Sequence, residues 1–145
     1  MKRIWIVILS IAILLFIWGQ SIIPVAQSAE ESGWITNNII NPILQFIGLE
    51  GVRDHVVRKA AHITEFFVFS VVAAQLWMGK PVGTLITGLL VAFLDESIQI
   101  LSHRGSQISD VWIDLVGVML GTLVGCLIWR MSERVRQRKA GDGNE

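Results

Sequence analysis

The chain has 145 residues, of which 52% are hydrophobic and 17% are charged, and its mean hydropathy is +0.58. Ordinary soluble domains are less apolar and more highly charged, so this composition predicts a membrane protein and excludes a soluble enzyme. The net charge is zero, but five of the twelve basic residues lie between Arg130 and Lys139, an asymmetry that concerns membrane topology rather than nucleic acid. The single cysteine, Cys126, excludes an internal disulfide and is interpreted as a small buried apolar residue.

Four segments are apolar over the length of about 20 residues that a helix needs to cross the hydrocarbon of a bilayer. In chain order these are residues 4–23, 60–78, 82–101 and 111–129. We therefore expect an all-α fold, a polytopic membrane four-helix bundle. It would form one integral membrane domain over residues 1–131, followed by a basic cytoplasmic tail over residues 132–145.

The first segment also has features of a signal peptide. Lys2 and Arg3 precede it, and Ala26, Gln27 and Ser28 form a candidate cleavage site. Its apolar run of nearly twenty residues is longer than the 7 to 15 residues that are usual in signal peptides, which favours an uncleaved membrane anchor.

The distribution of lysine and arginine predicts the orientation of the chain. The side that contains both termini and the turn at "MGKP" carries eight basic residues, and the other side carries four. Because short basic flanks remain in the cytoplasm, both termini are expected there, and residues 24–59 then form an outer loop. The basic residues of the outer side are Arg53, Arg58, Lys59 and Arg104.

The outer loop contains apolar residues at helical spacing. Ile35, Ile39, Ile43 and Phe46 recur in this way, and Pro42 interrupts them, so we expect a short broken helix that lies in the lipid interface. Asp54 is expected to be the N-cap of the helix that continues into the second span.

Polar residues from three of the predicted spans fall at one depth. Since a helix rises 1.5 Å per residue, each of these residues lies within about 9 Å of the outer end of its span. Exposure of a charged side chain to lipid in mid-span has a free-energy cost of at least about 2.5 to 3.5 kcal/mol. We therefore expect these polar side chains to face inward and to pair with Lys59, His62 or Arg104. The residues concerned are His62, Glu65, Asp95, Glu96, Gln99, Asp110 and Asp114.

Two interpretations of this set remain open. Lys59, Arg104 and Asp110 are near the interface, where loop charges and snorkelling side chains are ordinary. The deeper carboxylates form either an ion-pair network that only locks the helices together or a functional polar pocket. On the stripe that carries Asp114, the residues Gly117, Gly121 and Gly125 predict close packing against another helix.

The segments "RKAAHITEFF" and "LDESIQILSHRGSQISDVWIDLVGVMLG" resemble the VanZ-like family. The resemblance rests on Arg-Lys-x-x-His-x-x-Glu, then Asp-Glu-x-x-Gln, then an arginine and Asp-x-x-x-Asp before Gly-x-x-x-Gly, and it extends more weakly to "GQSIIPVAQSAEESGW". It implies a small multi-pass protein of the bacterial cell membrane, in a family sometimes linked to tolerance of lipophilic glycopeptides such as teicoplanin.

The chain departs from the family pattern at three places. Phe66 stands where the family often has tyrosine, and Ile98 stands where many members have histidine, which argues against a metal site that needs that histidine. The turn before Arg104 is also one residue shorter than the usual one.

The leading functional hypothesis is a binding protein for a lipid-linked cell-envelope precursor or a lipoglycopeptide, held in a pocket of the outer leaflet. Lys59 and Arg104 would hold an anionic head group, while the carboxylates and Gln99 orient these cations. The expected ligand-binding residues are Lys59, His62, Gln99, Arg104, Asp110 and Asp114. Membrane lipids are further expected partners, nucleic acid is not, and the oligomeric state is left open.

The alternative hypothesis is a membrane enzyme that acts on a lipid-linked substrate by acid/base chemistry. Here His62 would be the general acid or base, oriented by Glu65 or Asp95, and Glu96 is the further catalytic candidate. No nucleophile motif accompanies these residues, and they could equally bind Mg²⁺ only when substrate is present. No Walker, dinucleotide or zinc motif is found either, so no cofactor and no resident metal is expected. Proton-coupled transport is a third hypothesis, but polar groups in one leaflet give a monomer no path to the cytoplasm.

Overall fold

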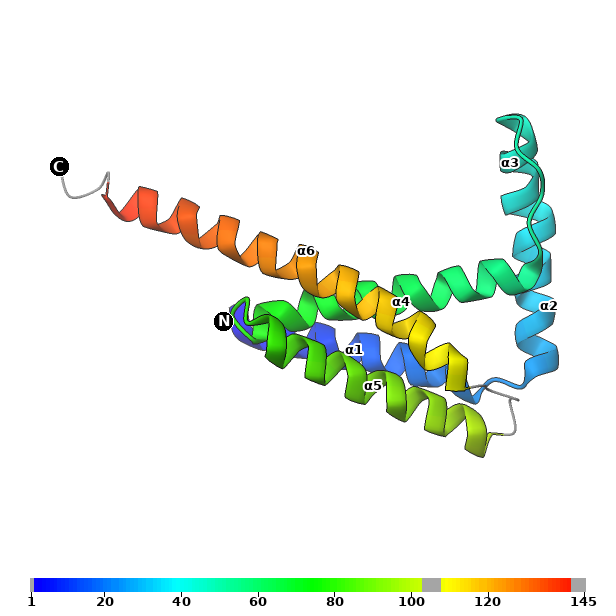
Figure 1. Ribbon diagram of the computed structural model, residues 1–145, viewed down its shortest axis with the longest axis horizontal. Helices are drawn as coiled ribbons and strands as arrows, with labels where there is room; N and C mark the ends of the chain where they lie inside the picture. Colours follow the sequence, from blue (N-terminus) through cyan, green and yellow to red (C-terminus); the bar gives the residue numbers. More distant parts are fainter. Residues whose placement is uncertain (1, 103–107, 142–145) are drawn as a thin grey trace.

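The computed structural model describes residues 2–102 and 108–141, and within these ranges helices joined by short connections form the fold, without a β-strand (Figure 1). Long runs of apolar and helix-favouring residues without an interior proline account for the long helices. The elements in chain order are α1 (Lys2–Ile22), α2 (Val25–Ile35), the π-helix η1 (Thr36–Ile40), α3 (Asn41–Phe46), α4 (Asp54–Leu76), α5 (Pro81–Leu101) and α6 (Ile108–Gly141).

The four long helices α1, α4, α5 and α6 pack side by side. Helix α4 contacts each of the other three, and its contact with α6 is the most extensive in the described part of the chain. The start of α1 and the end of α6 lie toward the same end of this assembly, and α2 with α3 lies across its opposite end (Figure 1). A small core holds the helices together, formed by Ile17, Phe66, Phe69, Ala73, Val91, Ala92 and Val118.

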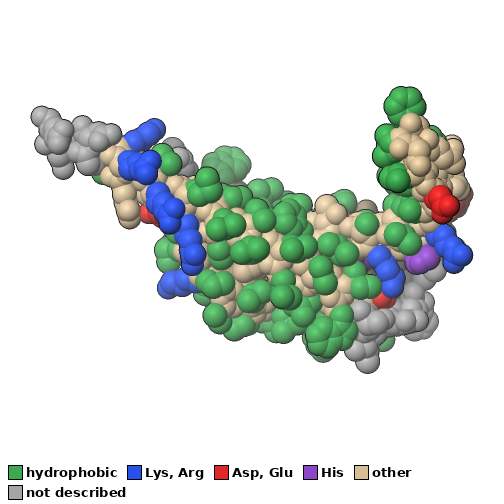
Figure 2. Space-filling view, turned by 45° about the horizontal axis from the view of Figure 1, so that its top comes forward, with side chains coloured by type: hydrophobic (Ala, Val, Ile, Leu, Met, Phe, Trp, Pro, Cys, Tyr) green, Lys and Arg blue, Asp and Glu red, His purple; other side chains and the backbone are tan. Residues whose placement is uncertain are grey.

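The distribution of side chains is the reverse of that in a soluble protein. Large apolar residues such as Leu15, Leu90, Phe93 and Leu123 are exposed on the outer faces of the helices, and Figure 2 shows apolar side chains over the long body of the molecule. Buried polar residues occur inside, Asp95 among them. Soluble monomers rarely expose continuous apolar surface of this kind, so the outer faces are suited to lipid.

Within the described residues, three helices are long and apolar enough to cross a membrane: Arg3–Ile22, Pro81–Leu101 and Asp110–Ala140. Helix α4, expected to span at residues 60–78, is not among them. Its first half carries Asp54, Arg58, Lys59 and Glu65, which lower its apolarity. Because α4 packs against all three apolar helices, it is the element that needs an apolar surface least.

Helix α6 approaches α4 through three glycines. A Cβ atom at Gly117 or Gly121 would collide with the backbone carbonyl oxygen of Ile63 or Phe67, and one at Gly125 would lie 2.6 Å from the Ala74 Cβ atom. Close to this contact, the Gln75 amide donates a hydrogen bond of 3.0 Å to the Gly125 carbonyl oxygen. The small-residue stripe therefore lets two helix backbones touch, which positions residues of α4 and α6 next to each other.

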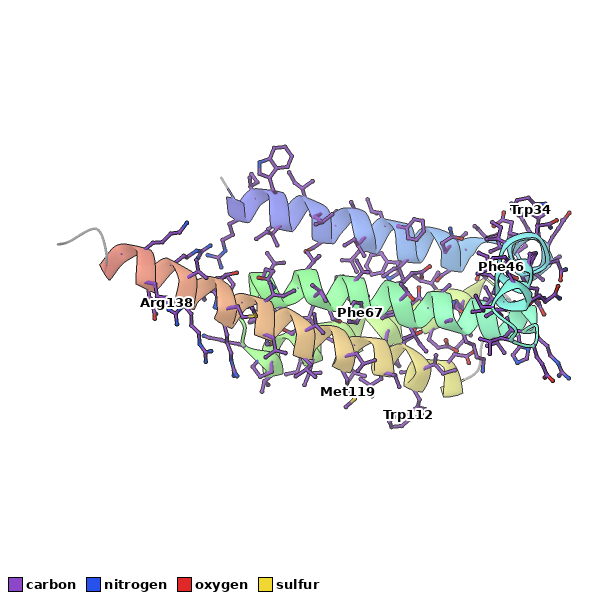
Figure 3. The ribbon with its side chains drawn as sticks, turned by 90° about the horizontal axis from the view of Figure 1, so that it is seen from above. Trp34, Phe46, Phe67, Trp112, Met119 and Arg138 are labelled. Atoms are coloured by element: carbon purple, nitrogen blue, oxygen red, sulfur yellow. The ribbon has the colours of Figure 1, made fainter. Side chains whose placement is uncertain are left out.

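The segment before α4 is more helical than expected. Helical structure runs from Val25 to Phe46 and includes the π-helix Thr36–Ile40 directly before α3, so Pro42 does not break it. Proline lacks an N–H group and is tolerated here because it lies at the start of α3. Figure 3 shows Trp34 and Phe46 on this arm, at the end of the molecule opposite Arg138.

Two boundaries differ from the sequence predictions. Asp54 is the first residue of α4 and Arg53 is its N-cap, so the expected capping role of Asp54 is wrong. The Asp54 carboxylate instead pairs with Arg58 at 3.3 Å, and its charge favours the first turn through the helix dipole. Helix α6 also continues beyond residue 129 to Gly141, because arginine, glutamine and lysine are good helix formers and no glycine or proline interrupts them.

The glycine contact predicts opposite effects of one substitution at two sites. Gly121→Ala should destabilise the protein by about 1 to 3 kcal/mol, because the new methyl group has no room against the α4 backbone. Gly19→Ala, on α1, should be neutral or stabilising by up to about 1 kcal/mol, because nothing lies within 4 Å of its Cβ position. Thermal unfolding in detergent measures both, and equal effects at the two positions would contradict the close packing of α4 and α6.

Candidate functional site

A group of polar side chains, here called the polar cluster, lies inside the helix assembly at the end nearest α2. Four helices contribute to it: Ser21 comes from α1, His62 from α4, Asp95, Glu96 and Gln99 from α5, and Asp114 from α6. Apart from His62, which is partly buried, all its members are buried. The cluster therefore places several ionisable groups in the interior, where burial of a charge is costly unless it has polar partners.

Asp95 is the most buried carboxylate of the polar cluster, with 0% of its surface exposed. The Ser21 hydroxyl donates a hydrogen bond to its Oδ1 atom, and the Gln99 Nε2 group donates one of 2.7 Å to its Oδ2 atom. Ser102, at the end of α5, also donates to the Ser21 carbonyl oxygen at 3.1 Å. Helix α1 is thus attached to the end of α5 through polar as well as apolar contacts.

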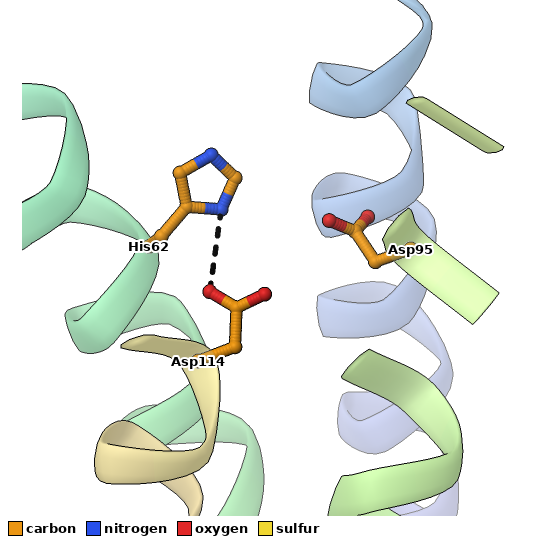
Figure 4. Close-up of side chains that lie close together, drawn as sticks. All are labelled: His62, Asp95 and Asp114. Atoms are coloured by element: carbon orange, nitrogen blue, oxygen red, sulfur yellow. Dashed lines mark ion pairs between the residues drawn. The ribbon is translucent and has the colours of Figure 1, made fainter. Parts of the chain in front are cut away.

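His62 and Asp114 form the link between α4 and α6. The His62 Nδ1 atom lies 3.8 Å from the Asp114 Oδ1 atom, and Figure 4 shows the two side chains facing each other with Asp95 across from them. Asp114 is buried, with 2% of its surface exposed. We expected Glu65 or Asp95 to orient His62, and this pair adds Asp114 to that set.

Negative charge is concentrated around Asp114. Asp95, Glu96, Asp110 and Glu65 all lie near enough to interact electrostatically with its carboxylate. Toward the open end of the cluster, the Lys59 amine lies 3.7 Å from Asp110, and both side chains are partly exposed. The site is therefore carboxylate-rich inside and has a cation at its rim.

The structure brings together most of the residues that the sequence singled out. His62, Asp95, Glu96, Gln99 and Asp114 meet in the polar cluster. Lys59 and Asp110 lie at its rim, and Glu65 lies near enough to interact electrostatically with Asp114. The expected ligand-binding residue Arg104 lies outside the described residues.

Sequence reasoning missed Ser21. A serine at the end of an apolar span is commonly bonded to its own helix, and the Ser21 hydroxyl does lie 3.1 Å from the Ile17 carbonyl oxygen. The available signal was its position in "GQSIIP", within the weaker part of the family resemblance.

An apolar groove lies between α1 and α4 on the side of Glu65. It encloses about 340 Å³ and is lined by Ala12, Ile13, Phe16, Thr64, Glu65 and Val68. Glu65 follows His62 by three residues on α4, so the groove begins one helical turn from the polar cluster. The site thus has two adjoining parts, an apolar groove and a charged interior.

One group of described residues has the composition and spacing of metal ligands. A ring nitrogen of His62 and a carboxylate oxygen from each of Asp95 and Asp114 all lie within 4.8 Å of one another. These residue types ligate divalent ions in many proteins.

The two buried serines of α1 make a matched test of the Asp95 contact. Ser21→Ala removes a donor to a buried carboxylate and should lower the free energy of unfolding by about 1 to 3 kcal/mol. Ser10→Ala removes only a bond of 2.9 Å to the Ile6 carbonyl oxygen of its own helix and should change stability by less than about 1 kcal/mol. Denaturant or thermal unfolding of the two variants measures the difference, and a null result for Ser21→Ala would exclude an energetic role of this bond.

The comparison with protein families agrees with the motifs that build the polar cluster. Residues 6–130 match the model of the VanZ/LLP1 family, and this range includes every residue of the cluster. Comparisons with curated proteins and with solved structures found no match. The apolar helices are those expected of a membrane protein, and the chain belongs to the VanZ/LLP1 family.

Proposed function

We propose that the protein binds a lipid-linked anionic molecule of the bacterial cell envelope, with the head group at the polar cluster and the lipid chain in the groove between α1 and α4. The observation that carries this proposal is that a charged interior adjoins an apolar groove on a membrane-facing surface. An amphiphile has the same two parts, and in a bilayer its tail and head group stay at fixed depths. A lipophilic glycopeptide has the same division into tail and polar group, so its capture at this site is the route to antibiotic tolerance.

The proposed topology has four spans with both termini in the cytoplasm. Two features support it: the chain ends lie toward the same end of the assembly, as an even number of crossings requires, and most of the basic residues are at that end (Figures 1 and 2). The positive-inside tendency then puts the polar cluster in the outer leaflet. The arm of α2, η1 and α3 would lie along the outer interface, where its exposed Trp34, Ile39 and Phe46 contact lipid.

Lys59 is the described cation best placed for an anionic head group. Its side chain is half exposed, and its amine is 3.7 Å from Asp110, which is longer than a charge-assisted hydrogen bond of about 2.7 to 2.9 Å. A phosphate at the rim can therefore recruit this amine without breaking a short ion pair. Asp110 and the interior carboxylates would fix its position and accept hydrogen bonds from a sugar or peptide.

Filling the groove tests where the lipid chain lies. Ala12→Trp should reduce the affinity for a long-chain polyprenyl phosphate at least tenfold, because the indole occupies the volume that the chain needs. Ile11→Trp is the matched control, since this neighbouring residue of α1 is 50% exposed and does not line the groove. Binding to detergent-solubilised protein is measured by native mass spectrometry, and equal affinities for the two variants would contradict a groove-bound chain.

Head-group recognition is tested separately. Lys59→Ala should weaken binding of the polyprenyl phosphate, with little effect on a neutral polyprenol of the same length. Lys80→Ala, on the turn before α5 at the opposite end of the assembly, should leave both affinities unchanged. If Lys59→Ala lost affinity for both the polyprenyl phosphate and the neutral polyprenol, the substitution would have damaged the fold rather than the head-group contact.

The pairing of His62 with Asp114 favours an enzyme as the second candidate function. A histidine oriented by a buried carboxylate is a suitable general base for hydrolysis of a lipid-linked phosphate. Wild-type protein would then convert a polyprenyl-linked substrate, and His62→Ala would reduce the rate by about 100-fold or more while binding persists. Ligand binding without any turnover by the wild type would eliminate this candidate and keep the binding function.

A further inference from the structure

Three residues of the polar cluster share one small space between α4, α5 and α6. The ligand atoms of His62, Asp95 and Asp114 come from these three helices and lie within 4.8 Å of one another. In Figure 4 the imidazole and the two carboxylates are directed toward the region that separates them. We propose that this region is a binding site for one divalent transition-metal ion, Zn²⁺ or Mn²⁺, ligated by these three side chains.

The distance between His62 and Asp114 fits two ligands better than a hydrogen bond. Their Nδ1 and Oδ1 atoms are 3.8 Å apart, beyond the range of about 2.7 to 3.2 Å of N–H···O hydrogen bonds. Two ligand atoms that each lie about 2.0 to 2.2 Å from one ion are up to about 3.6 Å apart at a tetrahedral angle. A shift of a few tenths of an ångström would allow these two atoms to reach the same ion, and the most distant pair of the three ligand atoms, within 4.8 Å, would have to close by about 1 Å.

Asp95 is already oriented as metal-binding carboxylates usually are. Ser21 and Gln99 each donate to one of its oxygen atoms and hold the carboxylate in place. A carboxylate has about four lone-pair positions, so these two hydrogen bonds leave capacity for a metal bond. The surrounding carboxylates Glu65, Glu96 and Asp110 produce a negative potential at Asp114, which favours a divalent cation there.

The ligand types select the class of ion. Imidazole is a preferred ligand of zinc and other transition metals, whereas Ca²⁺ and Mg²⁺ are usually held by oxygen atoms alone. A set of one histidine and two aspartates therefore suits Zn²⁺ or Mn²⁺. Three protein ligands leave at least one coordination position for water or a phosphate oxygen, as in catalytic rather than structural zinc sites.

A metal ion at these residues revises the expectation that none binds. That expectation rested on the absence of a zinc motif and on Ile98, which replaces a histidine often found on the same span in the family. The imidazole of the proposed site comes instead from His62 on α4, so the residue at position 98 does not decide the matter. The proposal is independent of lipid binding, because the metal alone is the probe.

The first experiment measures metal retention. The full chain is purified through a tag without histidine, treated with a chelator, loaded with Zn²⁺ or Mn²⁺ and analysed by elemental mass spectrometry. Wild type should retain about one ion per chain, and His62→Ala, Asp95→Asn and Asp114→Asn should each lower the affinity at least tenfold. His55→Ala and Asp54→Asn are the matched controls on the first turn of α4 and should retain the ion as wild type does.

A second measurement does not require substitution of any proposed ligand. The chain contains three histidines, so the double variant His55→Ala/His103→Ala has His62 as its only imidazole. Pulsed electron paramagnetic resonance of this variant loaded with Mn²⁺ should detect coupling to an imidazole nitrogen. Absence of a retained ion in wild type, selective retention of Ca²⁺, equal retention by His62→Ala, or bound Mn²⁺ without nitrogen coupling would each overturn the proposal.

Discussion

The structure depends on the cost of exposing a charged group to hydrocarbon. Isolated carboxylates in a bilayer are unfavourable by several kcal/mol, and Asp95 and Asp114 avoid contact with hydrocarbon because they are buried between the helices beside polar partners. Asp95 accepts hydrogen bonds from two side chains, and Asp114 lies beside His62. This constraint makes the helices specific partners of one another, because apolar surfaces alone would pack with little preference in lipid.

Helix α4 contributes to every part of this arrangement. It carries His62 and Lys59, lines the groove with Thr64, Glu65 and Val68, and receives α6 on its backbone. Its polar first half makes it the least suited of the four helices to face lipid, and it contacts each of the other three. The same composition that weakens α4 as an independent span supplies the side chains of the site.

Hydropathy and spacing predicted much of this organisation. Because the thickness of a bilayer sets the length of a membrane-spanning helix, apolar runs of that length located the three most apolar helices. The helical period and the rise per residue then predicted that most of the site residues lie at one end of the assembly. The role of Ser21 was not predictable in this way, because hydropathy does not reveal which residue 74 positions away lies opposite a hydroxyl group. Likewise, the arm from Val25 to Phe46 and the extension of α6 depend on local helix propensity, to which a search for apolar spans is insensitive.

The bond between Ser21 and Asp95 has a consequence for biosynthesis. The hydroxyl donor leaves the ribosome well before its carboxylate acceptor, which is 74 residues further along the chain. The contact between α1 and the polar end of α5 can therefore form only after α5 has been made. The first helix to be synthesised thus supplies a donor to a buried carboxylate of a later helix.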